Sequence, residues 1–176
     1  AELGMPAVGL TEQSNMCSLV KFYEGTTSAG IKPIIGADIW VRNPEDPHKP
    51  FRITLLARNQ TGFGNLTEII SLGYTDGLAT GVPLVEREWI EQRAEGLLML
   101  SGARDGDIGR AILAGKHELA EERTRYWAGL FPGAFYFELQ RTGRPYDEDC
   151  VHGQVALAQS LGLPVVATND VHFLEA

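Results

Sequence analysis

The sequence has 176 residues, 44% of them hydrophobic and 22% charged, which is enough for one globular domain with a substantial core. Fifteen basic against twenty-three acidic residues give a net charge of −8, a sign that disfavours direct binding to the phosphate backbone of a nucleic acid. The chain has no signal peptide and no apolar run near about 18 residues, so we expect a cytoplasmic protein without a membrane segment.

Strand-like and helix-like segments alternate along the chain, with apolar β-branched runs predicting strands and apolar residues at helical spacing predicting helices. In chain order we expect a strand over 7–10, a helix from Ser14 or Asn15 to about Ala29, a strand over 31–41, an exposed connection over 44–50, a strand over 51–57, helices over 61–72 and 86–93, a strand over 96–100, helices over 107–113 and 117–130, a strand over 134–139, a helix over 146–161, and a strand over 164–168. This alternation predicts a parallel sheet covered by helices, either doubly wound or closed as a barrel.

Two local features bear on packing and chemistry. The first predicted helix should have a buried face formed by Leu19, Val20, Phe22 and Tyr23. The segment Thr61 to Asn65 carries two glycines, but it does not follow a strand in the manner of a phosphate-binding loop. We interpret this segment as an ordinary turn and helix start.

The two cysteines, Cys17 and Cys150, lie far apart in the sequence and form no Cys-x-x-Cys motif. This spacing is typical of buried free thiols in a reducing compartment.

The last predicted strand ends in Asn169-Asp170-Val171-His172. In extended backbone, residues i and i+2 project to the same side, so Asp170 and His172 would present a carboxylate and an imidazole together. That pair suits a divalent metal at the carboxyl end of a buried strand, where α/β folds build their sites. The alternative interpretation is a pair of solvated loop residues.

Four segments, taken together, resemble one family. They are Gly9 to Asn15, Gly30 to Asp38, Leu55 to Leu66 and Val165 to His172. They resemble the polymerase-and-histidinol-phosphatase (PHP) domain, in the form that stands at the amino end of the bacterial DNA polymerase III alpha subunit. The resemblance implies a distorted seven-stranded α/β barrel with a metal cluster at the carboxyl ends of its strands. It also implies that residues 1–176 are a PHP domain fragment, truncated at both ends and lacking the first strand.

The departures from the family pattern fall on its metal ligands. Metal-binding members carry a His-x-His on the first strand, and have Thr-Asp-His-Gly where this chain has Thr11-Glu12-Gln13-Ser14. Asp38 stands at the place of a glutamate. Other ligand positions are occupied by Arg52, Ala103 and Thr142. The candidate metal ligands that remain are Glu12, Asp38, Asp170 and His172.

Four scattered ligands are too few for a cluster of two or three ions, because each ion needs four to six donors. At about 4 Å and an effective dielectric constant near 20, Arg52 would repel a dication by roughly 8 kcal/mol. The same guanidinium would attract Asp38 or Asp170, so we expect Arg52 to replace the metal as the positive centre and no metal cofactor to be held here. The alternative is that Arg52 points to solvent.

The resemblance therefore implies a part of a DNA-directed DNA polymerase, a nucleotidyltransferase that uses magnesium elsewhere in the protein. In DNA replication this part would be an inactive scaffold, contacting the rest of the alpha subunit and docking the proofreading exonuclease subunit, with little DNA binding of its own. The alternative is a metal-dependent phosphoesterase or 3′-5′ exonuclease that uses the remaining ligands.

Overall fold

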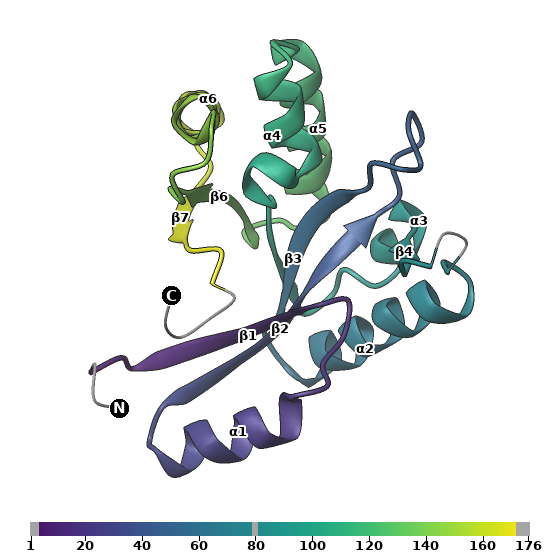
Figure 1. Ribbon diagram of the computed structural model, residues 1–176, viewed down its shortest axis with the longest axis vertical. Helices are drawn as coiled ribbons and strands as arrows, with labels where there is room; N and C mark the ends of the chain where they lie inside the picture. Colours follow the sequence, from purple (N-terminus) through teal and green to yellow (C-terminus); the bar gives the residue numbers. More distant parts are fainter. Residues whose placement is uncertain (1–3, 79–80, 172–176) are drawn as a thin grey trace. The chain divides into compact units, whose positions relative to one another are not determined.

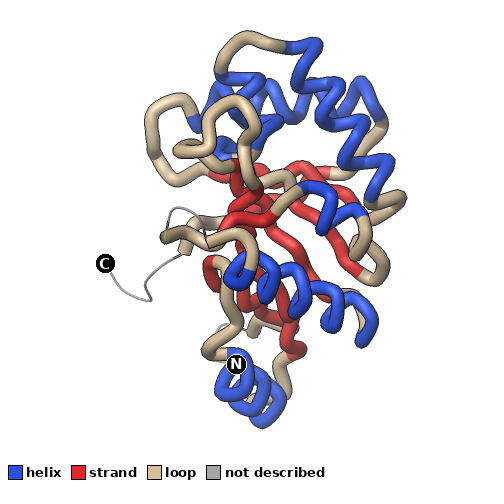
Figure 2. Tube along the Cα trace, turned by 90° about the vertical axis from the view of Figure 1, so that its right-hand side faces the viewer, coloured by secondary structure: helices blue, strands red, loops and turns tan. Residues whose placement is uncertain are grey.

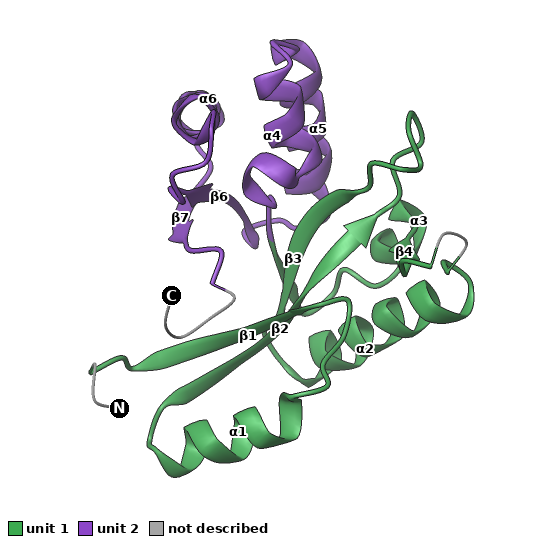
Figure 3. Cartoon of the chain, viewed as in Figure 1, with its two compact units in different colours: residues 1–99 green, residues 100–176 purple. Residues whose placement is uncertain are grey.

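A computed structural model describes residues 4–78 and 81–171 (Figure 1). The chain divides into two compact units, residues 1–99 and residues 100–176 (Figure 3). Strands and helices alternate through both units (Figure 2), as the sequence predicts, and the described residues contain seven strands. No helix among these residues is both long and apolar enough to cross a membrane.

The first unit contains five strands and three helices. They are β1 (Ala7–Gln13), α1 (Leu19–Ser28), β2 (Lys32–Val41), β3 (Phe51–Ala57), α2 (Gln60–Thr75), β4 (Leu84–Val85), α3 (Arg87–Glu91) and β5 (Leu97–Leu100), the last ending at the unit boundary. The short strand β4 was not predicted, and the other bounds differ from the predicted ones by a few residues at most, apart from the later start of α1.

The sheet of the first unit is mixed rather than parallel. β1 and β4 run parallel to β2, whereas β3 runs antiparallel to it, so the expectation of an all-parallel sheet is wrong at this pair. The reason lies in the connection over 42–50, which contains three prolines and no helix. A parallel neighbour needs a long crossover, usually a helix, while a short loop returns the chain antiparallel.

α2 covers this sheet because its apolar side chains Leu66 and Ile69, both fully buried, pack against β2 and β3. Its first turn is capped by Asn59, whose Oδ1 accepts a hydrogen bond from the Gly62 N–H at 2.9 Å. The predicted helix start in this glycine-containing segment is therefore confirmed. Gly62 touches the backbone of Gly96 so closely that a side chain would have no room: an added Cβ would lie 1.9 Å from the Gly96 carbonyl oxygen.

α1 differs from the predicted helix both in where it begins and in how it packs. It begins at Leu19, with Ser18 at the N-cap position, not at Ser14 or Asn15. None of its residues is buried, and Val20 and Tyr23 are 67% and 53% exposed. The apolar spacing was present, but the main contacts of this helix in the described part of the chain are with β1 and β2, and they leave much of its surface open.

The second unit consists of the 3-10 turn η1 (Ala103–Asp105), the helices α4 (Asp107–Leu113), α5 (His117–Leu130) and α6 (Asp147–Leu161), and the parallel strands β6 (Phe135–Gln140) and β7 (Val165–Thr168). A buried carboxylate joins α4 to α5: Asp107 accepts hydrogen bonds from the Trp127 indole N–H at 3.0 and 3.2 Å. Trp127 is 1% exposed and packs against Phe131 and Tyr126, which makes it a centre of this unit's core.

Candidate functional site

Asp38, Arg52 and Thr54 form a polar cluster on neighbouring strands, here called the Asp38 cluster. The antiparallel register sets Asp38 of β2 opposite Thr54 of β3, and Arg52 lies two residues before Thr54 on the same face of the sheet. Arg52 Nη1 lies 3.1 Å from Asp38 Oδ2, and the Thr54 hydroxyl donates to the other carboxylate oxygen. With side chains only 11% and 19% exposed, Arg52 and Asp38 form a largely desolvated ion pair, so the solvent-facing alternative for Arg52 is wrong.

Glu12 belongs to a different environment. The register of β1 with β2 sets Gln13 opposite Asp38 and Glu12 opposite Ala37, so Glu12 projects to the other face of the sheet. Its carboxylate accepts hydrogen bonds from the Ser18 backbone N–H at 3.0 Å and the Ser18 hydroxyl at 2.7 Å. Glu12 thus anchors the start of α1, and the structure does not bring it to Asp38.

Ser14 has a φ of 52°, in the left-handed region that favours glycine. Its N–H donates to the Asp38 carbonyl oxygen at 2.7 Å, which ties the end of β1 to β2. The Ser14 hydroxyl is buried and has no hydrogen-bond partner among the described residues.

Asp170 forms an ion pair with Arg144, whose Nη2 donates to Asp170 Oδ2. The Asp170 side chain is 16% exposed, so this carboxylate too lies mostly out of water. The other half of the Asp170-x-His172 motif, His172, lies outside the described residues, and the structure says nothing of that pair.

A second cluster, here called the Asp147 cluster, contains Asp147, Thr142, Arg144 and Arg104. One oxygen of the buried Asp147 carboxylate accepts hydrogen bonds from the Thr142 N–H and hydroxyl, both at 2.9 Å, and from the Arg144 N–H at 3.2 Å. The other oxygen lies 3.2 Å from Arg104 Nη1. Burial raises the pKa of the Asp147 carboxyl, but the hydrogen bonds from these donors lower it by more than burial raises it. The pKa of Asp147 therefore lies below its ordinary value of 3.8.

A third group of polar side chains is buried between β6 and β7. Glu138 Oε1 accepts from the Thr168 hydroxyl at 2.6 Å and from Gln140 Nε2 at 3.1 Å, and Gln140 Nε2 also lies 3.2 Å from the Thr168 hydroxyl oxygen. The side chains of Gln140 and Thr168 come together because the parallel register of β6 and β7 sets these two residues opposite each other. These side chains stand near the carboxyl ends of two adjacent strands, where they stabilise the pairing.

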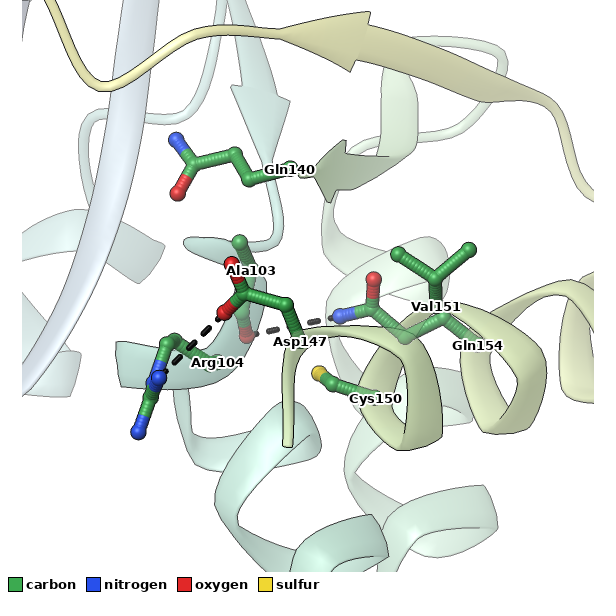
Figure 4. A pocket seen from close by; sticks show the side chains of 7 residues that line it. All are labelled: Ala103, Arg104, Gln140, Asp147, Cys150, Val151 and Gln154. Carbon is green, nitrogen blue, oxygen red and sulfur yellow. Dashed lines mark hydrogen bonds and ion pairs between the residues drawn. The ribbon is translucent and has the colours of Figure 1, made fainter. Parts of the chain in front are cut away.

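A small pocket lies beside the Asp147 cluster (Figure 4). It is lined by Ala103, Arg104, Gln140, Asp147, Cys150, Val151 and Gln154. The pKa of the Cys150 thiol is raised to about 11: burial raises it most, Arg104 lowers it, and the nearby Asp147 and Asp105 raise it by smaller amounts. The thiol is therefore protonated at neutral pH and is a poor nucleophile.

The two cysteines should differ sharply in reactivity. Cys150 is buried as the sequence predicts, but Cys17 is exposed, which contradicts the expectation of two buried thiols. In an assay with a thiol-reactive disulfide at pH 8, we expect Cys17 to react rapidly and Cys150 at least about 100-fold more slowly, because the Cys150 thiol is buried and its pKa of about 11 keeps it protonated. The Cys17→Ser variant should lose the fast phase alone, and two fast thiols in the native protein would contradict this assignment.

The Arg52–Asp38 pair should contribute measurably to stability. Arg52→Ala leaves the Asp38 carboxylate largely buried without its guanidinium, so we expect the free energy of unfolding to fall by about 2 to 3 kcal/mol in equilibrium urea titrations. Lys49→Ala is the matched control, because Lys49 also faces an aspartate, Asp46, but its side chain is 74% exposed. An Arg52 variant as stable as the Lys49 variant would show that the ion pair is unimportant.

Other side chains engage the described carboxylates at the candidate ligand positions and in the Asp147 cluster. Each of Asp38, Asp147 and Asp170 faces a guanidinium, and Glu12 is engaged by Ser18. No group of three or more His, Cys, Asp or Glu side chains within the described ranges is arranged to hold a metal ion. The donor set around Asp38 fits a metal poorly, because Arg52 already supplies the positive charge there.

The sequence predicted Asp38 or Asp170 as the partner of Arg52, and the structure shows Asp38. The sequence analysis missed Thr54, Arg144 and Asp147. For Thr54 a signal existed: Arg52 and Thr54 are polar residues at i and i+2 in an otherwise apolar strand, which places both on one face. Arg144 and Asp147 lie in and just after a loop, and no periodic pattern could pair them with Asp170 or Thr142.

Comparisons with known proteins were made on the whole chain. The family model described as the PHP domain matches residues 1–142. The DNA polymerase III subunit alpha of Pseudomonas fluorescens is 54% identical over 174 residues, which is 98% of this chain and 15% of that protein. The subunit of Escherichia coli K12 is 46% identical over 176 residues, again 15% of its length. The chain thus spans about 15% of the length of these curated relatives.

Among solved structures, one of a protein assigned as a metal-dependent phosphoesterase, from Bifidobacterium adolescentis, matches with a TM-score of 0.56 at 10% sequence identity. The match covers 98% of this chain and 79% of that one. At this identity the likeness concerns the fold alone, and it confirms the predicted α/β class.

Proposed function

Because this chain belongs to the PHP domain family, we propose that it serves as the PHP domain of a replicative DNA polymerase III alpha subunit and acts there as a scaffold rather than as a metalloenzyme. The parent protein would be a cytoplasmic DNA-directed DNA polymerase. Its nucleotidyl transfer would use magnesium at carboxylates outside these residues.

The Arg52–Asp38 ion pair is the observation that carries the scaffold proposal. A guanidinium 3.1 Å from the carboxylate supplies the charge that a metal ion would otherwise supply, and it cannot be deprotonated at any physiological pH. Thr142, at another ligand position of the family, is held by Asp147, and its hydroxyl is a weak ligand compared with an imidazole. In this proposal Glu12, Asp38, Asp170 and His172 are remnants of a metal site, and Arg52 is the substitute for the metal.

The proposed partners are the rest of the alpha subunit and the proofreading exonuclease subunit. The relatives named above support the first of these, since they are alpha subunits of which this chain matches 15%. The proposal that the exonuclease subunit is a partner rests on the family resemblance alone. The net charge of −8 supports little direct contact with DNA.

Metal content tests the scaffold proposal directly. Protein purified without chelator should contain far less than one zinc, manganese or iron per chain by elemental analysis, because the described residues include no group of three or more His, Cys, Asp or Glu side chains that could hold an ion. One ion per chain that is lost in His172→Ala would refute the scaffold assignment.

The second candidate function is a metal-dependent phosphoesterase or exonuclease, which the fold likeness to the Bifidobacterium protein favours. It requires manganese-dependent release of nucleotides from single-stranded DNA or of phosphate from an ester, abolished by His172→Ala. We expect neither activity. The release assay should also be run on the whole polymerase subunit, together with a primer-extension assay. Because His172→Ala should leave primer extension unchanged, a loss of release alone would assign the release activity to these residues.

A further inference from the structure

The pocket beside the Asp147 cluster contains a buried acceptor without a donor. Gln154 of α6 is fully buried, and its Oε1 accepts no hydrogen bond within the described part of the chain. An unsatisfied buried amide oxygen is destabilising unless water or a ligand reaches it. Figure 4 shows this oxygen turned toward the side on which Gln140 lies.

The orientation of the Gln154 amide is determined by its other end. Nε2 lies 3.4 Å from the Ala103 carbonyl oxygen, so rotating the amide would set Oε1 against that oxygen, acceptor against acceptor. Ala103 is itself held rigidly, with φ of 48° at a buried position. The acceptor is therefore aimed into the pocket by its surroundings.

The polar groups that line the pocket are already engaged. Gln140 Nε2 faces both Glu138 Oε1 and the Thr168 hydroxyl oxygen, and Arg104 Nη1 faces the Pro145 carbonyl and Asp147. Neither of these nitrogens is placed to donate to Gln154 Oε1. Within the described ranges no side chain or backbone group donates a hydrogen bond to Gln154 Oε1.

The size and charge of the pocket restrict what that donor can be. The cavity volume is about 10 Å³, which is just enough to admit one water molecule. The Asp147 carboxylate is compensated by Arg104, so the pocket offers no net negative charge to hold a cation. We infer that this pocket is a binding site for a single ordered water molecule, which donates to Gln154 Oε1.

Water-to-amide NMR cross-relaxation on the glutamine-labelled protein tests this inference. The Gln154 side-chain amide should show NOE and ROE cross-peaks to water of opposite sign, the signature of water held longer than surface hydration water. Gln159, exposed on the same helix, is the matched control and should show only the surface pattern.

A crystal structure that resolves ordered solvent gives an independent reading. The expected result is a water about 2.7 to 3.2 Å from Gln154 Oε1 in the native protein and none at that place in Gln154→Met. A dry pocket, or a Gln154 oxygen satisfied by a protein donor, would overturn the inference. So would a metal or alkali cation at the site, identified by anomalous scattering.

Discussion

Gly62→Ala should lower the free energy of unfolding by about 3 kcal/mol or more. The added Cβ would lie 1.9 Å from the Gly96 carbonyl oxygen and 2.4 Å from its carbonyl carbon, so either α2 or the Gly96 turn must move. Movement would also strain two hydrogen bonds at this contact, from Gly62 N–H to Asn59 and from Arg58 N–H to Gly96. Equilibrium urea unfolding followed by circular dichroism measures the loss.

Gly64→Ala is the control, since it makes the same chemical change two residues further along the same helix. Gly64 has nothing within 4 Å of an added Cβ, and alanine is the better helix former. We expect a gain of about 0.5 to 1 kcal/mol from this variant. Equal effects of the two substitutions would show that α2 does not approach Gly96 this closely.

Asp147→Ala should lower the free energy of unfolding by about 3 to 5 kcal/mol, because it removes a buried acceptor and leaves its donors without a partner. The Thr142 N–H, the Arg144 N–H and Arg104 Nη1 all converge on this carboxylate. The substitution should therefore release the loop over 141–146, which also carries the partner of Asp170.

Asp149→Ala serves as the control for Asp147, because Asp149 lies exposed in the same first turn of α6. It should change stability by no more than about 0.5 kcal/mol. If the two variants behave alike, the effect belongs to helix-terminal charge and not to the hydrogen bonds of Asp147.

The lowered pKa of Asp147 adds a pH dependence to this prediction. A carboxyl whose pKa is lower in the folded state stabilises the protein above its unfolded pKa, and this contribution is lost as pH falls through the folded value. The stability difference between the native protein and Asp147→Ala should therefore shrink as pH falls below 3.8. A difference that stays constant into strong acid would mean that the carboxylate charge is unimportant.

The sequence left Asp38 and Asp170 open as partners of Arg52, but by itself it determined the alternation of strands and helices and the family. These follow from local periodicity and from motifs that are read along the chain. The helices over 107–113 and 117–130 have the predicted bounds because their apolar spacing agrees with their packing.

Only the tertiary structure decided which neighbours each polar side chain meets. Strand register turned Glu12 away from Asp38 and toward Ser18, and the antiparallel return of β3 placed Thr54 on Asp38. Long-range contacts also decided burial: the apolar residues Val20 and Tyr23 stay exposed because little lies against α1, while Gln154 is enclosed by segments distant in sequence. Contacts between residues far apart in the chain set these outcomes, and no period or spacing along the sequence encodes them.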